Sequence, residues 1–326
     1  MERRQFVFPH ARIFLGEPGP MRLHVTVAIQ TKCISGEWVL PSPAKVNLML
    51  SVHGRRADGW HALTSLVVPL EFGDTLTIRA APSFDRLRCT NPAVPLGPNN
   101  LVLRAAALLR ARLGREVYFE FDLDKRIPIG AGLGGGSSNA AVALQGMNQV
   151  LGRPFGKQAL SEMAATLGSD CPFFIEAQPA LMCGRGEVIE PLSAALAAPL
   201  RGTRVLLFRP DFAVDTPWAY QHLAAGAPNG YEAEAIAMAR LAQFSKTGHL
   251  AEMLYNSFEA PVGNKYLAIA TLLEQLRASG VACLMSGSGS ACFALPNGEG
   301  PNVEQIKQII RDAWGEAVFW VETFIR

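Results

Sequence analysis

The sequence has almost no excess of charge and no long hydrophobic run. Its 30 basic and 28 acidic residues leave a net charge of +2, which gives no electrostatic case for binding nucleic acid. No apolar stretch is long enough to span a membrane, and residues 1–34 contain acids, little serine and no apolar segment of a secretory signal. We therefore expect a cytoplasmic protein whose partners include neither a nucleic acid nor a membrane.

Patterns for metal binding and disulfide bonding are also missing. The six cysteines form no C-x-x-C pair, and the six histidines do not supply a zinc-ligand spacing. We expect free thiols in a reducing compartment, and no metal ligand is certain. Apolar residues, in contrast, are abundant: they make up 49% of the 326 residues, enough to build the cores of two domains.

Glycines gather in one stretch, which reads Pro-Ile-Gly-Ala-Gly-Leu-Gly-Gly-Gly-Ser-Ser-Asn-Ala over residues 128–140. Apolar and polar residues alternate before it, as in a strand with one buried face, and apolar residues recur at helical spacing after it. A helix that begins at such a loop favours an anion, because its first backbone N–H groups are unpaired and no Cβ atom keeps the ligand away. Ser137 and Ser138 are suited to cap this helix or to donate to phosphate oxygens. The alternative is a flexible loop or an ordinary capped turn.

Three familiar nucleotide-binding signatures do not fit this stretch. Gly130, Gly132 and Gly135 match G-x-G-x-x-G. In a dinucleotide-binding fold, the helix after this motif is followed by a parallel strand that ends in an acid. Here a loop with Pro154 and another predicted helix follow instead. The stretch also lacks the final G-K-[ST] of a Walker A motif. The H-R-D and D-F-G signatures of protein kinases are absent from the chain.

Polar and aromatic residues stand out at three further places. Lys45 and Asn47 lie two apart on a predicted strand and therefore share one face. Trp60 and His61 follow an Asp-Gly turn signal, and Asp170 lies between a glycine that ends a helix and a proline. Each has a plainer interpretation: a solvated edge lysine, a surface aromatic residue or a capping aspartate.

The remaining periodicity predicts helices and strands on both sides of an Ala- and Pro-rich segment at residues 191–203, where we expect a domain boundary. Before this segment, the predicted elements are strands at 21–29, 63–70, 75–79 and 117–123, short strands on either side of a turn at 184–186, and helices at 101–113 and 157–167. After it, they are a strand at 205–208, helices at 217–225, 231–243, 247–255 and 257–279, two strands around a Gly/Ser turn at 286–290, a helix at 302–314 and a strand at 317–323.

Three motifs in this order resemble the GHMP kinase superfamily, which includes galactokinase, homoserine kinase and mevalonate kinase. They are Pro43-Ala-Lys-Val-Asn-Leu-Met-Leu50, the glycine stretch, and Ser286-Gly-Ser-Gly-Ser-Ala-Cys-Phe293. Segments 56–61, 72–75, 168–174, 184–187 and 256–259 are most similar to the branch whose acceptor is 4-diphosphocytidyl-2-C-methyl-D-erythritol. Together these motifs are far more specific than any one of them alone.

The resemblance implies an α+β chain with the two-domain GHMP kinase fold. Residues 1–39 would form an N-terminal extension, and residues 40–195 an ATP-binding domain similar to domain 2 of ribosomal protein S5. Residues 200–326 would form a ferredoxin-like C-terminal domain. The implied activity is transfer of the γ-phosphoryl group of ATP to the 2-hydroxyl of that cytidine diphosphate-linked polyol, in the non-mevalonate (methylerythritol phosphate) route to isoprenoid precursors.

The resemblance also implies roles for individual residues. Asp170 would take the hydroxyl proton, Lys45 would keep the acid ionised and stabilise the transferred group, and Asn47 would contact the acceptor. Mg²⁺ would bridge the phosphates of ATP, with Ser138 as the candidate protein ligand. The residues implied to bind ATP are Pro128, Gly130, Gly132, Leu133, Gly134, Gly135, Gly136, Ser137, Ser138 and Asn100. Those implied to bind the cytidine end of the acceptor are Trp60, His61, Thr216 and Tyr220.

Three alternatives stay open at this stage. The chain could be a GHMP kinase for another small molecule, such as mevalonate or homoserine. It could be a catalytically inactive nucleotide-binding sensor on the same fold. The glycine stretch could also serve only to let two segments pack closely.

Overall fold

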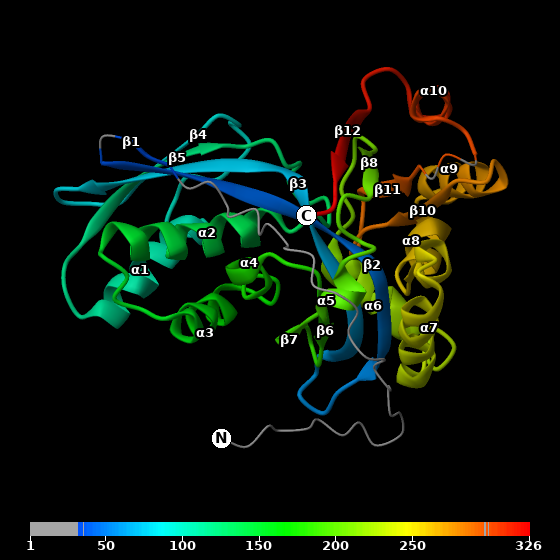
Figure 1. Cartoon of the computed structure of the whole chain (residues 1–326), viewed down its shortest axis with the longest axis horizontal. Helices are drawn as coiled ribbons and strands as arrows, with labels where there is room; N and C mark the ends of the chain where they lie inside the picture. Colours follow the sequence, from blue (N-terminus) through cyan, green and yellow to red (C-terminus); the bar gives the residue numbers. More distant parts are fainter. Residues whose placement is uncertain (1–31, 35, 297, 299) are drawn as a thin grey trace, which may run out of the picture.

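Two long antiparallel strands run through the middle of the molecule (Figure 1). The computed structural model describes residues 32–34, 36–296, 298 and 300–326. Strand β2 covers Glu37–Arg55 and β3 covers His61–Ala81, and they pair in register from Trp38 opposite Ile78 to Arg55 opposite His61. Because each strand is about twenty residues long, this ribbon extends through both halves of the protein.

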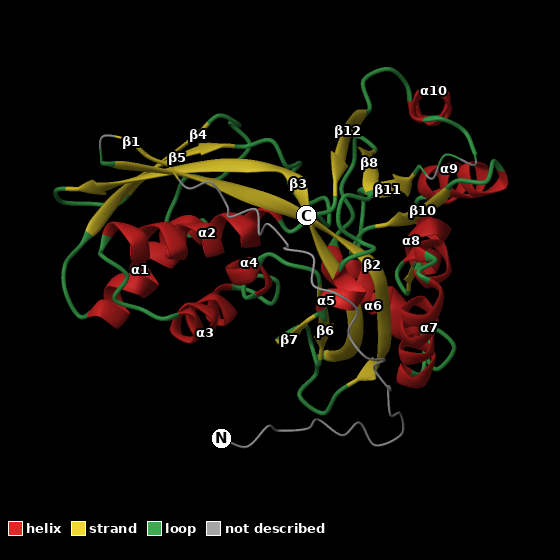
Figure 2. Cartoon of the chain, viewed as in Figure 1, coloured by secondary structure: helices red, strands yellow, loops and turns green. Residues whose placement is uncertain are grey.

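The first half is a sheet with helices on one face (Figure 2). The strand order is β1-β2-β3-β5-β4, with β1 at Lys32–Ile34, β4 at Arg86–Cys89 and β5 at Tyr118–Asp124. The helices are α1 (Leu101–Leu113), α2 (Gly135–Val150), α3 (Lys157–Leu167) and α4 (Phe173–Glu176). Their apolar faces bury one hydrophobic core against the sheet, with Leu76, Ile78, Phe121, Leu144 and Phe173 among its members.

Short strands extend the ribbon near its hairpin end. Strand β6 (Ala180–Cys183) pairs with β3, and β7 (Val188–Pro191) pairs with β6. Strand β9 (Tyr255–Asn256) comes from the second half of the chain and pairs in parallel with β2. The two halves of the sequence are therefore joined through a shared sheet.

The second half contains a four-stranded sheet in the order β10-β11-β8-β12. These strands are β8 (Arg204–Arg209), β10 (Ala282–Met285), β11 (Cys292–Leu295) and β12 (Phe319–Phe324). The helical segments are α5 (Ala194–Ala197), α6 (Thr216–Ala225), α7 (Glu234–Thr247), a 3₁₀ turn (Leu250–Met253), α8 (Glu259–Lys265), α9 (Leu267–Ala278) and α10 (Val303–Trp314). The order strand, helices, two strands, helix, strand is the ferredoxin-like arrangement expected from the sequence.

Strand β2 is buried on both faces. Consecutive residues of the strand are buried: Leu40 joins the core of the first half, and Val46 and Leu48 belong to a second cluster. The latter pack in one cluster with Leu207 and Phe293 of the second sheet. This double burial explains why the segment from residue 43 to residue 50 reads as a nearly continuous apolar run, and it fixes Lys45 and Asn47 deep inside the protein.

The structure corrects several predicted elements. The two strands expected at 63–70 and 75–79 are one strand, β3, and the helix expected at 257–279 is divided into α8 and α9 at Tyr266. The helix expected at 247–255 is only the short 3₁₀ turn followed by β9. Strand β4 and helices α4 and α5 were not predicted, and the strand expected at 21–29 lies outside the described residues. Strand β1 and the start of β2 bring residues 32–34 and 37–39 of the expected extension into the sheet.

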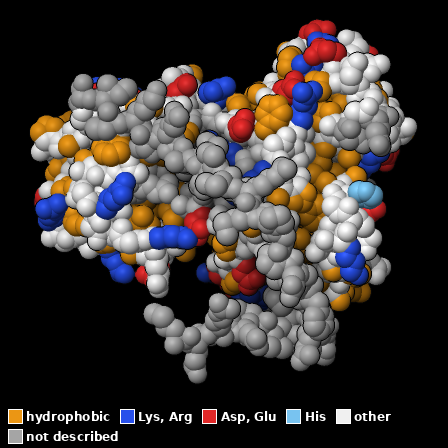
Figure 3. Space-filling view, viewed as in Figure 1, with side chains coloured by type: hydrophobic (Ala, Val, Ile, Leu, Met, Phe, Trp, Pro, Cys, Tyr) orange, Lys and Arg blue, Asp and Glu red, His pale blue; other side chains and the backbone are white. Residues whose placement is uncertain are grey.

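Three general observations agree with the composition. Within the described residues, no helix is both long and apolar enough to cross a membrane. On the face that Figure 3 shows, basic and acidic side chains are scattered among one another. The five cysteines whose side chains the structure describes are free, as the sequence predicts.

Candidate active site

Lys45, Asn47 and Asp170 lie together in the structure. Register shifts in the β2–β3 pairing on both sides of Lys45 and Asn47 set this short piece of strand apart. The Lys45 ammonium donates to Asn47 Oδ1 over 2.7 Å and lies 3.6 Å from Asp170 Oδ2. Asn47 in turn donates to the hydroxyl of Ser65 on β3 over 2.8 Å. The lysine is nearly buried, whereas 40% of the Asp170 side chain is exposed, so the carboxylate is the member of the pair that a ligand can reach.

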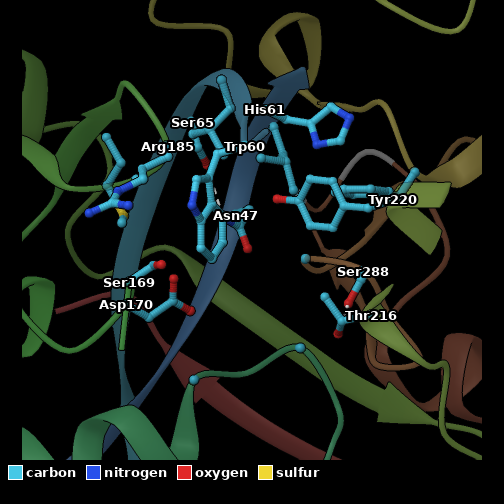
Figure 4. Close-up of a pocket in the computed structure, with 18 of the residues that line it drawn as sticks. Asn47, Trp60, His61, Ser65, Ser169, Asp170, Arg185, Thr216, Tyr220 and Ser288 are labelled. Carbon is cyan, nitrogen blue, oxygen red and sulfur yellow. Dashed lines mark hydrogen bonds between the residues drawn. The ribbon is translucent and has the colours of Figure 1, made fainter. Parts of the chain in front are cut away.

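A cavity of about 530 Å³ opens beside this pair. Its lining includes Lys45, Asn47 and Asp170 and the aromatic residues Trp60, His61 and Tyr220. Figure 4 shows Asp170 and Ser169 on one side of this space, facing Thr216 and Ser288. The hydroxyl oxygens of Thr216 and Ser288 are 2.7 Å apart. The cavity therefore joins an ion pair to a cluster of aromatic rings.

The glycine stretch lines a second cavity, of about 440 Å³. Asn100, Pro128, Gly130 and Leu133 to Ser137 border it. Gly132 and Gly134 line both cavities, so the two spaces meet at the loop. Helix α2 begins at Gly135, its N-cap is Gly134, and no side chain caps it. The first N–H groups of the helix are therefore available to an anion. The prediction that Ser137 or Ser138 caps the helix is wrong, because both serines lie inside its first turn.

The glycines of the loop are required by close contacts. A Cβ atom on Gly132 would lie 2.3 Å from the carbonyl oxygen of Ser286, and one on Gly134 would lie 2.8 Å from the ring of Phe174 and 3.0 Å from the Lys45 side chain. The backbone N–H of Lys45 donates to the carbonyl of Leu133 over 3.0 Å. The loop is thus clamped between the strand that carries the lysine and the Gly/Ser turn after β10, which excludes the interpretation of a flexible loop.

Ser138 does not lie where the expected Mg²⁺ ligand should be. It is fully buried, and its hydroxyl accepts a hydrogen bond from Ser42 over 2.8 Å. It lines neither of the two cavities. Position four of the helix turns this side chain toward the sheet. Ser137 is half-buried and borders the second cavity, so it is the serine of the pair that stays accessible. No cluster of three potential metal-ligating side chains occurs among the residues that the structure describes.

A buried polar network holds the loop from behind. Asp74 accepts from the backbone N–H groups of Arg126 and Ile127, both over 2.7 Å, and pairs with the Lys125 ammonium. Asn139 of helix α2 donates to Asp74 over 2.8 Å and to Ser42 over 2.8 Å. The Asp74 carboxylate is completely enclosed, and its contacts tie both residues 125–127, just before the glycine stretch, and Asn139, near its end, to β3. The sequence pattern singled out the segment of Asp74 but assigned it no role.

Two tyrosine rings lie close to His61, which lines the first cavity. Its ring centre lies 5.0 Å from that of Tyr220, and its Nε2 lies 3.2 Å from the Tyr231 hydroxyl. Burial lowers the pKa of His61, and the positive charge of Arg55 lowers it further. Burial, together with the charge of Asp170, raises the pKa of Tyr220 to about 12. Both rings are therefore neutral near pH 7, and Trp60, 53% exposed, lines the same cavity.

The structure thus brings the predicted residues into two groups. The acid, the lysine and the aromatic residues share the first cavity, and Asn100 and the glycine stretch share the second. Asn100 also caps α1 through a bond from Val102 N–H, so its side chain oxygen is already engaged. Sequence reasoning missed Ser65 and Tyr231, since each contacts its partner from a distant part of the chain.

Comparisons with known proteins agree with this arrangement. Residues 100–178 match the model of the GHMP kinases N terminal domain, and residues 237–316 match that of the GHMP kinases C terminal domain. The chain is similar to 4-diphosphocytidyl-2-C-methyl-D-erythritol kinase from Protochlamydia amoebophila (strain UWE25), with 37% identity over 80% of this chain and 85% of that protein. It is also similar to the protein of the same name from Synechococcus sp. (strain CC9902), with 39% identity over 78% of this chain and 86% of that protein.

Solved structures give the same result. A crystal structure of 4-(cytidine 5'-diphospho)-2C-methyl-D-erythritol kinase superposes with a TM-score of 0.70 and 33% identity, over 88% of this chain and 99% of that chain. Homoserine kinase from Cytophaga hutchinsonii superposes with a TM-score of 0.66 over 91% of this chain and 97% of that chain, at 16% identity. The latter similarity concerns the fold alone.

Proposed function

Since the chain belongs to the GHMP kinases and, among them, to the family of 4-diphosphocytidyl-2-C-methyl-D-erythritol kinases, we propose that it phosphorylates the 2-hydroxyl group of that cytidine diphosphate-linked polyol with ATP as donor. The observation that carries the proposal is the Lys45–Asp170 pair, which lies in the first cavity next to the loop that borders both cavities. We assign ATP to the second cavity and the polyol to the first, so that the two meet at Gly132 and Gly134.

The proposed reaction is a direct phosphoryl transfer. The acceptor hydroxyl oxygen attacks the γ-phosphorus, the bond from that phosphorus to the bridging oxygen of ATP breaks, and ADP leaves. Asp170 takes the hydroxyl proton. Lys45 lies 3.6 Å from the carboxylate and supplies positive charge where negative charge spreads over the transferred group. Positioning of the two reactants accounts for much of the rate enhancement in such a transfer.

The glycine stretch is proposed to hold the phosphates of ATP through the first N–H groups of α2. Mg²⁺ bound to ATP would neutralise phosphate charge during the transfer. Ser138 does not fit as its ligand, because its hydroxyl is buried against Ser42. Ser137, which borders the second cavity, is the serine of the pair whose hydroxyl could reach such a metal.

The cytidine end of the acceptor is assigned to the aromatic cluster. Tyr220 and Trp60 offer ring faces for stacking on the base, and the neutral ring of His61 can hydrogen-bond with the cytosine edge. The contact between His61 and Tyr231 supports this role, since it orients the imidazole at the wall of the cavity. Neither mevalonate nor homoserine has a ring that could stack on these aromatic side chains.

A kinase assay that couples ADP formation to a colour change tests the proposal. We expect turnover of the cytidyl polyol and none of mevalonate or homoserine; the reverse pattern would reject the proposed acceptor. In the Asp170→Ala variant, turnover is expected to fall by a factor of about 10²–10⁴ while ATP affinity is retained, and Lys45→Ala should lose a similar factor. The exposed Asp312 on α10 provides the matched control, Asp312→Ala.

The same variants address the inactive-sensor alternative. A sensor would bind Mg·ATP and raise the melting temperature, but it would show no turnover that depends on Asp170. Near-normal turnover in Asp170→Ala would remove this residue from the role of base. No stabilisation of the wild-type protein by millimolar Mg·ATP would mean that the glycine stretch is a packing device only.

A further inference from the structure

The turn between β6 and β7 carries an arginine into the first cavity. The turn is Gly184-Arg185-Gly186, and two backbone hydrogen bonds fix it: Leu63 N–H donates to the Gly184 carbonyl over 2.7 Å, and Gly186 N–H donates to the Cys183 carbonyl over 3.0 Å. Both glycines have positive φ, +71° and +105°, a conformation that suits glycine. Arg185 and Gly186 both line the cavity.

Arg185 lines this cavity next to Trp60, on the side that carries Ser169 and Asp170. Its guanidinium carbon is 5.4 Å from the centre of the Trp60 ring. Gly186, the next residue of the turn, packs near the acid: a Cβ atom placed on it would lie 3.9 Å from the Cβ of Ser169, the neighbour of Asp170. Figure 4 shows the same arrangement, with Arg185 on the side of Ser169 and Asp170 and next to Trp60.

The arginine is weakly engaged within the protein. Its closest carboxylate, Glu187, is 4.0 Å away, and 45% of the side chain is exposed. Lys45, in contrast, is nearly buried and is committed to Asn47 and Asp170. Among the described residues that line the cavity, Lys45 is the one lysine and Arg185 is the one arginine. Arg185 is therefore the cation that an incoming ligand can engage without breaking a short contact.

We propose that Arg185 binds the diphosphate of the acceptor and so determines its affinity for the enzyme; this inference rests on the proposed function. In a cytidine diphosphate-linked polyol, the diphosphate links the base to the reacting alcohol, and Arg185 lines the same cavity as Asp170 and lies over the Trp60 ring. The diphosphate carries two negative charges close to the Asp170 carboxylate, so a counter-charge is needed there. A planar guanidinium offers paired N–H groups to phosphate oxygens, which a lysine does not.

Competition by fragments of the acceptor tests this inference separately from turnover. The inhibition or dissociation constants of CDP and of cytidine are measured for the wild type and for Arg185→Gln. The wild type should bind CDP at least about tenfold more tightly than cytidine, since hydrogen bonds to a charged group are strong. In Arg185→Gln this ratio should approach one while cytidine affinity stays unchanged. Arg185→Lys should keep part of the ratio, because the charge remains without the paired donors.

Steady-state kinetics provide the second readout. With the cytidyl polyol, Arg185→Gln should raise the KM for this acceptor by about tenfold and leave kcat within about threefold, the pattern of a lost binding contact. The KM for ATP should not change. Arg201, an exposed arginine between α5 and β8, gives the matched control, and Arg201→Gln should behave as the wild type.

Each result decides one question. If Arg185 only supports the Trp60 ring, Arg185→Gln will weaken cytidine and CDP equally, and the unchanged ratio overturns the inference. Failure of the wild type to phosphorylate the cytidyl polyol overturns the proposed function instead. The ratio of CDP to cytidine affinity still decides the role of Arg185 in that case, because it requires no turnover.

Discussion

The contact between Gly132 and the Ser286 carbonyl makes a sharp prediction, because Gly152 offers a matched comparison. Both glycines have φ of +78°, so alanine at either position pays the same conformational penalty of about 1–2 kcal/mol. A Cβ atom on Gly152 would meet nothing within 4 Å, whereas one on Gly132 would lie 2.3 Å from the Ser286 oxygen and 3.2 Å from that of Gly289. The two substitutions therefore differ in the steric contact alone.

Overpacking against backbone that must shift adds about 1–3 kcal/mol. We expect Gly152→Ala to lose about 1–2 kcal/mol of unfolding free energy and Gly132→Ala to lose about 2–5 kcal/mol in total. Urea unfolding of the two variants and the wild type, followed by tryptophan fluorescence, measures the difference. Turnover should fall in Gly132→Ala, which displaces the loop between the cavities, and should persist in Gly152→Ala. Equal losses of stability in the two variants would refute the close packing of the two loops.

Two further predictions concern buried charge and pH. Asp74→Asn breaks the buried pair with Lys125 and should cost about 3–5 kcal/mol of unfolding free energy. Glu162→Gln removes an exposed pair and should cost less than about 1 kcal/mol. A similar loss of unfolding free energy in both variants would contradict the role given to burial. The pKa of His61 in the folded protein is lowered from 6.5, so as the pH falls the unfolded chain binds a proton at this residue before the folded protein does. His61 therefore makes the unfolding free energy decrease as the pH drops below about 6.5. His61→Gln should reduce the difference in urea midpoint between about pH 7.5 and pH 5.5, and an unchanged difference would exclude His61 as its source.

Local pattern was sufficient to find the glycine stretch and its neighbours. The alternation before it and the helical spacing after it are properties of consecutive residues, and the structure has β5 and α2 at these positions. The shared face of Lys45 and Asn47 also follows from the period of a strand, and their side chains are hydrogen-bonded. These features depend on neighbours in the sequence, so no knowledge of the tertiary fold was needed.

The division of β3 into two predicted strands has a tertiary cause. Gly73 resembles a turn residue in the sequence, but it lies within the strand, where a Cβ atom would come 2.3 Å from the carbonyl oxygen of Ser42. Glycine is present there because the paired backbone approaches closely. A contact with a residue 31 positions away leaves no local signal, so the sequence alone cannot separate this case from a turn.

In the candidate active site, too, the contacts between residues far apart in the sequence could not be predicted. The hydroxyl of Ser138 was expected to face the anion, but helix α2 starts at Gly135, and this register turns the side chain toward Ser42. Tyr231 reaches His61 across 170 positions of sequence, and Arg185 reaches Trp60 from another hairpin. Such contacts depend on how the elements pack, which single-residue patterns do not encode.

The loop that borders both cavities has a kinetic consequence. In the proposed assignment, the nucleotide in one cavity and the acceptor in the other would occupy separate volumes that touch at Gly132 and Gly134, so neither would have to leave before the other enters. With this division, the phosphoryl group passes directly within a ternary complex. Initial-rate lines for varied donor at several acceptor concentrations should therefore intersect, whereas the parallel lines of a ping-pong mechanism would require a phosphorylated enzyme.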